Sequence, residues 1–177
     1  MRKLKNSELE RKTISEFKNS EKAPFVVVLD NIRSLNNIGS VFRTSDAFLL
    51  EAVYLCGITA CPPNKEIHKT ALGSTDSVDW KYFENTEDAI SDLKNKNYII
   101  ASVEQVENSI SLENFKIDKN KKYAFVFGNE VKGIKQNVVN LSDIFIEIPQ
   151  LGTKHSINIS VSLGVVLWEV FKQYSFE

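Results

Sequence analysis

The sequence predicts an α/β protein in which a mostly parallel β-sheet is covered by helices on both faces. Continuous apolar runs such as FVVVLD (residues 25–30), YIIASV (98–103) and YAFVFG (123–128) are typical of strands buried on both faces. Segments with helical spacing separate these runs, and strands that alternate with helices favour parallel pairing. At 177 residues the chain is long enough for one well-packed domain.

The chain begins with a charged arm. Ser7 to Glu10 has the S-x-x-E form of a capping box, which predicts a polar helix of about a dozen residues. Pro24 ends the arm. We therefore divide the chain into an N-terminal helical arm, residues 1–24, and one α/β domain, residues 25–177.

The elements after the first strand follow from periodicity and capping signals. They are a helical stripe from Ile38 to Leu49, a strand in AVYLCG (52–57), a proline-rich loop at Pro62 and Pro63, a strand in VDWKYF (78–83) and a helix in TEDAISDLKNK (86–96). After the strands at 98–103 and 123–128 come a short helix in IKQNVVNLS (134–142), a strand in IFIEIP (144–149) and an apolar C-terminal helix. Ligands bind such sheets at the carboxyl ends of the strands, which directs attention to residues 30–43, 103–107, 128–135 and 149–158.

Composition narrows the class of protein. The chain is 42% hydrophobic and 25% charged, which argues against disorder. No apolar run approaches the roughly 20 residues that span a bilayer, and the N-terminus lacks the apolar segment of a secretory signal, so we expect a cytoplasmic protein. Because the formal net charge is −1, contact with nucleic acid requires local basic patches. The candidates are the arm (Arg2, Lys3, Lys5, Arg11, Lys12), Lys65 with His68 and Lys69, residues 116–122, and Lys132 with Lys135.

Metal and nucleotide motifs are incomplete. Cys56, Cys61 and His68 form C-x4-C-x6-H, which lacks the spacing and the fourth ligand of a zinc module. We expect two reduced thiols and no metal. The glycines of residues 128–133 have the spacing of a phosphate-binding loop, but Ile134 stands where lysine is required, which argues against a nucleotide triphosphatase.

Three polar segments follow predicted strands. NNIGSVFR (36–43) places Gly39 and Arg43 four residues apart on one helical face, where uncovered backbone beside a guanidinium suits a ligand. FGNEVKGI (127–134) has the glycines of a tight loop whose backbone contacts another group. IPQLGTKHSINISVS (148–162) leads into the apolar helix. Taken singly, the first two also fit a surface arginine and an ordinary turn.

Taken in order, the three segments resemble the motifs of one family. Asn37 and Arg43 in N-x-G-x-x-x-R, then FGNEVKG, then IPQLGTKHSINISVS are similar to the SpoU, or TrmH-like, branch of the SPOUT RNA methyltransferases. The resemblance covers residues 25–171. It implies an α/β fold with a deep C-terminal trefoil knot, S-adenosylmethionine as cofactor, a homodimer, and methylation of a ribose 2′-hydroxyl in RNA. Gln150 and Ile157 depart from the methionine and leucine that are frequent there.

The resemblance also implies roles for individual residues. Arg43 would be the catalytic residue, Asn37 and Glu130 would order it, and Ser156 and Asn158 would contact the RNA. The cofactor would be lined by Val103, Gly128, Ile148, Leu151 and Ile157. Because arginine stays protonated in proteins, we expect Arg43 to stabilise developing alkoxide charge and not to act as a base. In this family the arginine can serve the pocket of the partner subunit.

The substrate is less sharply defined. The short arm favours transfer RNA over ribosomal RNA, because family members that act on large ribosomal RNA often carry an additional N-terminal domain. KTALGSTDSVDW (69–80) adds some similarity to enzymes that modify a D-loop guanosine. The alternatives are a ribosomal RNA methyltransferase and a non-catalytic RNA-binding protein that keeps the fold. Val165 to Tyr174 is apolar nearly all round, which favours burial by the domain and by a partner.

Overall fold

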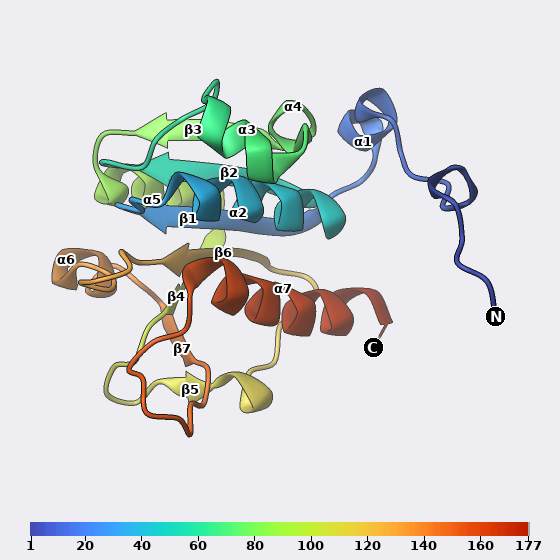
Figure 1. Cartoon of the computed structure of the whole chain (residues 1–177). Helices are drawn as coiled ribbons and strands as arrows, with labels where there is room; N and C mark the ends of the chain where they lie inside the picture. Colours follow the sequence, from blue (N-terminus) through green and yellow to red (C-terminus); the bar gives the residue numbers. More distant parts are fainter. Residues whose placement is uncertain (177) are drawn as a thin grey trace.

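The computed structural model describes residues 1–176 and shows a seven-stranded sheet in the order β3-β2-β1-β6-β4-β7-β5 (Figure 1). Every pair of neighbouring strands is parallel. The strands are β1 (Ala23–Asp30), β2 (Leu50–Cys56), β3 (Asp79–Phe83), β4 (Tyr98–Val103), β5 (Ile110–Ser111), β6 (Lys122–Phe127) and β7 (Ile144–Glu147). The predicted α/β class with a parallel sheet is confirmed.

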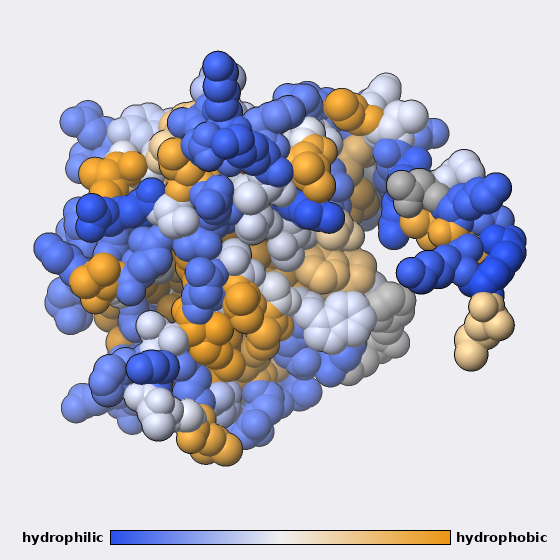
Figure 2. Space-filling view, in the orientation of Figure 1, coloured by the Kyte–Doolittle hydropathy of each residue, from blue (hydrophilic) through white to orange (hydrophobic). Residues whose placement is uncertain are grey.

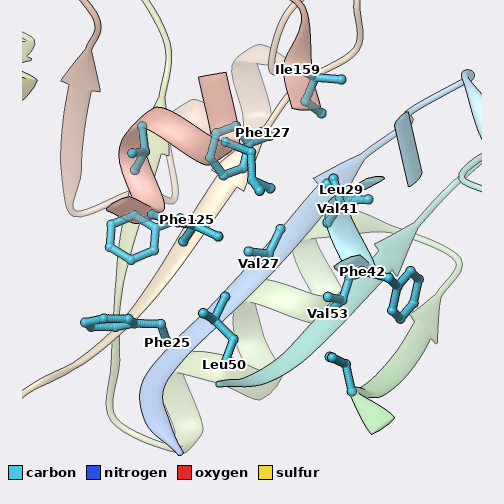
Figure 3. Close-up of a cluster of buried hydrophobic side chains, with 14 of the residues drawn as sticks. Phe25, Val27, Leu29, Val41, Phe42, Leu50, Val53, Phe125, Phe127 and Ile159 are labelled. Carbon is cyan, nitrogen blue, oxygen red and sulfur yellow. The ribbon is translucent and has the colours of Figure 1, made fainter. Parts of the chain in front are cut away.

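Helices cover both faces of the sheet. In Figure 1, α2 (Leu35–Ala47) and α7 (Ile159–Phe176) lie in front of the sheet, and α5 (Thr86–Asn95) lies behind it. Odd-numbered residues of β1 and β6, such as Val27 and Phe125, face α2 and α7 in one cluster, part of which Figure 3 shows. Even-numbered residues, such as Val28, face α5 and the short α6 (Gln136–Val139). This alternation explains why the central strands are continuously apolar.

The arm differs from the prediction. Residues at Asn6–Glu8 form only a 3₁₀ turn, and the helix α1 spans Ile14–Asn19. Its capping box is made by Thr13 and Glu16, not by Ser7 and Glu10. Glu10 has a positive φ of 46°, which is incompatible with a helix through this position. Phe17 is buried in the main cluster, so the helix forms where it has an apolar residue to pack.

Two short helices were not predicted. The helices α3 (Lys65–Ala71) and α4 (Ser74–Ser77) lie in the segment between β2 and β3. Both are too short for an apolar period to be visible, although Asn64 caps α3 by accepting hydrogen bonds from the amides of Glu66 and Ile67. The helix expected over residues 134–142 is also shorter, since α6 has four residues.

Gly39 has a structural role that corrects the ligand-facing interpretation. It is buried at the contact between α2 and α3. A Cβ at this position would lie 2.0 Å from the Thr70 hydroxyl oxygen and 2.3 Å from the Ile67 carbonyl oxygen. The glycine therefore allows two helices to pack closely, and it leaves no backbone open to a ligand.

The C-terminal helix buries one side and exposes another apolar side. Leu163, Val166, Leu167 and Val170 are fully buried against the sheet. Val161, Val165 and Trp168 remain 53%, 42% and 51% exposed, and Figure 2 shows apolar side chains gathered along α7. Within the described residues, no helix has the length and apolar character needed to cross a membrane.

Candidate active site at the carboxyl edge of the sheet

A buried aspartate holds this edge together. Asp30, the last residue of β1, is completely buried and accepts hydrogen bonds from the Thr86 hydroxyl (2.6 Å) and the Asn31 amide (2.7 Å). Its second oxygen accepts one from the backbone amide of Lys135 (3.2 Å). The carboxylate thus joins β1 to the start of α5 and to the end of the loop over residues 128–135. Such bonds offset the cost of burying a charge.

The loop that follows β6 folds tightly on itself. Asn129 and Gly133 exchange backbone hydrogen bonds of 3.1 and 2.9 Å, and the Asn129 side chain donates to the Asn31 carbonyl oxygen (2.8 Å). A Cβ on Gly128 would lie 2.3 Å from the carbonyl carbon of Gly133. Gly133 has a φ of +65° and lies against the Glu104 carboxylate. The two glycines therefore shape the loop: Gly128 lies against the loop itself, and Gly133 lies against Glu104.

A hydrogen-bonded cluster joins the three motifs. Glu130 accepts bonds from the backbone amides of Arg33 (3.3 Å) and Ser34 (3.2 Å) and from the Asn37 amide (3.3 Å). The amide of Asn158 in turn donates to the side-chain oxygen of Asn37 (3.2 Å). We call Asn37, Glu130 and Asn158 the motif cluster. It unites residues that are separated by 93 and 121 positions in the chain.

The environment of Glu130 keeps it charged. Partial burial raises the pKa of Glu130, but hydrogen bonds from its own amide, from the amides of Arg33 and Ser34, and from Asn37 outweigh this effect. The pKa of Glu130 consequently lies below its ordinary value. An ionised carboxylate at this point fixes the first turn of α2, which begins after the Ser34 cap.

Asn158 also begins the C-terminal helix. Its side-chain oxygen accepts hydrogen bonds from the Ser160 amide (2.9 Å) and hydroxyl (2.7 Å). This confirms that the polar stretch before α7 is a helix-capping junction and not a strand. Ser156 is exposed and lies two residues earlier, on the wall of a neighbouring cavity.

That cavity lies between the ends of β4 and β7 and the loop before α7. Three predicted cofactor residues, Val103, Ile148 and Ile157, line it, whereas Gly128 and Leu151 are not among its lining residues. Leu151 is fully exposed. The residues that the sequence did not single out are Glu104, Gln105, Ile146, Glu147, Gln150, His155 and Ser162. For Glu104 and Gln105, the position directly after the buried β4 was the available signal, whereas Ile146 and Glu147 end β7 and Ser162 lies in α7.

The lining fits S-adenosylmethionine in chemical type. Val103, Ile146 and Ile148 provide apolar contact suited to a purine ring. Glu104 and Glu147 place carboxylates where a cationic, hydroxyl-rich molecule would find acceptors. Glu104 uses one oxygen to accept the Ile134 amide (2.8 Å) and the other to accept the Gln105 amide (3.1 Å), so its orientation is fixed.

Arg43 lies apart from the motif cluster. It is exposed and, within residues 1–176, makes no ion pair or hydrogen bond with the cluster. It follows Asn37 by six residues, which places it about 9 Å further along the helix axis. Arg43 instead lines a groove formed with the arm and with residues 71–77. The structure brings together Asn37, Glu130 and Asn158 but does not bring Arg43 to them.

The fold and this site define a class. A parallel α/β sheet whose carboxyl edge joins the three motifs beside a cavity with apolar and carboxylate lining is the arrangement of a SpoU-type methyltransferase of the SPOUT superfamily, with its knotted fold. The chain belongs to the SpoU rRNA methylase family, which matches residues 24–168. The fold and the family predicted from the three motifs are confirmed.

Relatives and solved structures agree with this assignment. An uncharacterized tRNA/rRNA methyltransferase of Borreliella burgdorferi is 31% identical over 160 residues, covering 90% of this chain and 68% of the relative. A 23S rRNA (guanosine-2′-O-)-methyltransferase of Nitrosomonas europaea is 28% identical over 151 residues, covering 85% of this chain and 56% of the relative. The chain thus spans little more than half of that second relative.

Two crystal structures show the same fold. The AdoMet-bound rRNA methyltransferase of Sinorhizobium meliloti has a TM-score of 0.79 and 25% identity, with 89% of this chain and 59% of that chain covered. The TrmH/SpoU tRNA modifying enzyme of A. aeolicus also has a TM-score of 0.79 and 25% identity, with 90% and 80% covered. S-adenosylmethionine is thus the cofactor expected for this family, in agreement with the sequence.

Proposed function

We propose that this protein transfers a methyl group from S-adenosylmethionine to a ribose 2′-hydroxyl of RNA, with transfer RNA as the favoured substrate. The single observation that supports this most strongly is the motif cluster, in which Asn37, Glu130 and Asn158 meet by hydrogen bonds beside the cofactor cavity. Family membership supports the same reaction class.

The chain's contribution to the reaction is mainly positional. The cofactor, when bound, supplies an electrophilic methyl group, and transfer requires a ribose oxygen held in line with it. Ser156, on the cavity wall, and Asn158, at the start of α7, have the positions to orient the ribose and its neighbouring phosphate. Asn158 is itself held by Asn37, so its direction is set before RNA arrives.

Arg43 would stabilise the charge that develops on the ribose oxygen. An arginine side chain stays protonated, so it is a poor base and a good partner for an alkoxide or a phosphate. An RNA phosphate or a water molecule would then accept the proton of the hydroxyl. Because Arg43 is separated from the motif cluster of its own chain, it would act on the site of a second subunit.

A homodimer would supply that second subunit. Val161, Val165 and Trp168 form an exposed apolar stripe on α7, and with Leu112 and Pro149 they line an open apolar depression. Apolar patches of this kind on a folded surface mark interfaces. The stripe continues onto α2 through Phe48, whose ring lies 6.2 Å from that of Trp168. The pairing would therefore involve the helix that bears Arg43.

The proposed substrate class follows from the relatives and from one loop of the chain. Relatives are described both as tRNA/rRNA and as 23S rRNA methyltransferases, so both remain candidates. The loop segment over residues 69–80 favours transfer RNA, with a D-loop guanosine as the target. Cys56 and Cys61 are free thiols, which suits the reducing cytoplasm.

A labelling experiment tests the proposal. The protein is incubated with methyl-labelled S-adenosylmethionine and either transfer RNA or ribosomal RNA, and the product is digested to map the methylated ribose. We expect a 2′-O-methylated nucleoside in transfer RNA. Label only in ribosomal RNA would correct the substrate. No label in either RNA, together with cofactor binding measured by calorimetry, would show a non-catalytic RNA-binding protein.

The dimer has its own test. Val165→Glu places a charge in the exposed stripe of α7 without disturbing the buried side of the helix. We expect sedimentation to show conversion from dimer to monomer, with methyl transfer reduced by at least about tenfold because interface charges are costly to desolvate. Ser175→Glu, which adds the same charge at an exposed position of α7 outside the depression, is the control for effects on the helix itself. If the Val165→Glu protein remained dimeric, the interface would lie elsewhere on the surface.

A further inference from the structure

A groove runs between the arm and the body of the protein at Arg43. It has a volume of about 640 Å³ and is lined by Arg11 and Lys12 of the arm, by Arg43 of α2, and by Leu72 and Ser74 on the opposite side. Figure 2 shows a hydrophilic arm that stands off from the body of the molecule. The groove is distinct from the cofactor cavity, with which it shares no lining residue.

The arm wall of the groove is held in place. Phe17 is 4% exposed and packs into the main apolar cluster, which fixes α1 against the domain. Thr13 and Glu16 close the start of α1 with reciprocal hydrogen bonds of 2.7 and 3.2 Å. Arg11 and Lys12 directly precede this capped turn, so their backbone lies at a defined distance from α2.

The cations in the groove form no ion pair among the described residues, although Lys12 interacts by charge with the nearby Glu16 carboxylate. Elsewhere, Arg2 pairs with Glu8 at 2.7 Å, and Lys69 pairs with Glu66 at 2.7 Å. No ion pair of Arg11, Lys12 or Arg43 occurs within the described residues.

The acids at the groove offset its cations only in part. Of these acids, Asp46 already accepts a hydrogen bond from Ser77 (2.5 Å), and Glu10 lies at the rim. Residues 1–22 carry seven basic and four acidic side chains, a net charge of +3, although the whole chain has −1.

We propose that this groove binds the phosphates of the RNA strand next to the target ribose, with Arg11 and Lys12 on one side and Arg43 at its end. The inference rests on the proposed function and adds the path of the substrate. Three cations that form no ion pair among the described residues lie along one channel, which matches a polyanion with regularly spaced charges. Leu72, which is 64% exposed, and Ile14, 50% exposed, offer apolar rims to sugars and bases.

The test compares two charge reversals. Arg11→Glu/Lys12→Glu changes the groove, and Lys81→Glu/Lys94→Glu makes the same change at two exposed lysines of β3 and α5, outside every candidate basic patch. For each protein, the dissociation constant for unfractionated transfer RNA is measured between 50 and 200 mM salt, about the range over which phosphate contacts change affinity most visibly. Calorimetry with S-adenosylmethionine and sedimentation are measured in parallel.

We expect the groove variant to bind transfer RNA at least about tenfold more weakly, and its log–log salt slope to fall by about 1–2, since each phosphate contact contributes about 0.7–0.9. Its cofactor affinity and oligomeric state should not change, and the control should match the wild-type protein. An unchanged slope would overturn the proposal. A change in oligomeric state would show that the groove receives a second copy of the chain.

The proposed function can fail separately from the groove. The wild-type protein could bind RNA with a steeper salt dependence than the groove variant and yet transfer no methyl group. In that case the proposed reaction would be wrong, and the groove would still be the RNA-binding surface. The wild-type protein and the groove variant could instead methylate RNA with the same KM and the same salt slope. In that case the groove would not be the RNA-binding surface, and the proposed reaction would be correct.

Discussion

The motif cluster and the groove lie along the same helix, α2, but the side chains of the cluster are held by hydrogen bonds and the cations of the groove are not held by ion pairs. In the cluster, Glu130 and Asn158 are both bonded to Asn37, which is 9% exposed. In the groove, Arg43 and the two cations of the arm face solvent with no ion pair among the described residues. The chain thus organises the part of the site near the cofactor by itself, and it leaves charge free where RNA and a second subunit would complete the site.

Arg43 provides the sharpest contrast between the two regions. We expect Arg43→Ala to lower the single-turnover rate of methyl transfer by about 10²–10³, the usual cost of removing one group that stabilises a developing oxyanion. Because Arg43 is exposed, the free energy of unfolding and the affinity for S-adenosylmethionine should stay unchanged. Rapid-quench measurements with saturating RNA and calorimetry separate these quantities.

Arg43→Lys keeps the charge and removes the planar fork, so it distinguishes charge from geometry. We expect it to recover only a small part of the lost rate. A lysine variant with the full single-turnover rate would show that placement by the guanidinium is unimportant. A large loss of cofactor affinity in Arg43→Ala would instead show that Arg43 belongs to the organised region.

Gly39 links the two regions, because it seats α2 against α3, next to the segment that forms the far wall of the groove. In Gly39→Ala the new Cβ would lie 2.3 Å from the Ile67 carbonyl oxygen, which is backbone and must shift. We expect a loss of about 1–3 kcal/mol in the free energy of unfolding, measured by urea denaturation. Gly152→Ala, where a Cβ meets nothing within 4 Å, should change it by less than about 0.5 kcal/mol.

A different result for Gly39 would restore the interpretation drawn from the sequence. If Gly39→Ala were as stable as the wild-type protein and yet bound RNA or cofactor poorly, then the glycine would lie against a ligand and not only against α3. Gly39 would then be part of the surface that binds RNA or the cofactor.

The sequence predicted the helices and strands better than it predicted the contacts between residues that are distant in the chain. Residues 98–103, for example, form a strand with the expected bounds. A strand that is buried on both faces needs apolar residues at every position, and this is visible in the sequence. The motif cluster could be predicted only through family resemblance, since Asn37 and Asn158 are separated by 121 positions and no local period links them. The roles of Gly39 and of the glycines around Asn129 depend on which backbone approaches them, and this is visible only in the folded chain.

A change at Glu130, with the smallest expected effect, tests how much the charge of this residue contributes to the hydrogen bonds of the motif cluster. Glu130→Gln keeps the shape but weakens the bonds from Arg33, Ser34 and Asn37. We expect a loss of about 1 kcal/mol at neutral pH, near the low end for bonds to a charged group because Glu130 is exposed. Methyl transfer should fall about tenfold, since Asn37 and Asn158 lose part of their support.

The pH dependence of this loss identifies its origin. The pKa of Glu130 is lower in the folded protein than its ordinary value of 4.5, so its charge stabilises the fold fully above about pH 4.5. This stabilisation is lost as the pH falls through the folded-state pKa. The difference between the wild type and Glu130→Gln in urea denaturation should therefore be constant from pH 6 to 8 and shrink below about pH 4.5. Glu107→Gln, at an exposed carboxylate outside the cluster, should show neither effect. A difference that persists unchanged into acid would mean that Glu130 supports α2 through its shape, and the organised region would then depend on packing more than on charge.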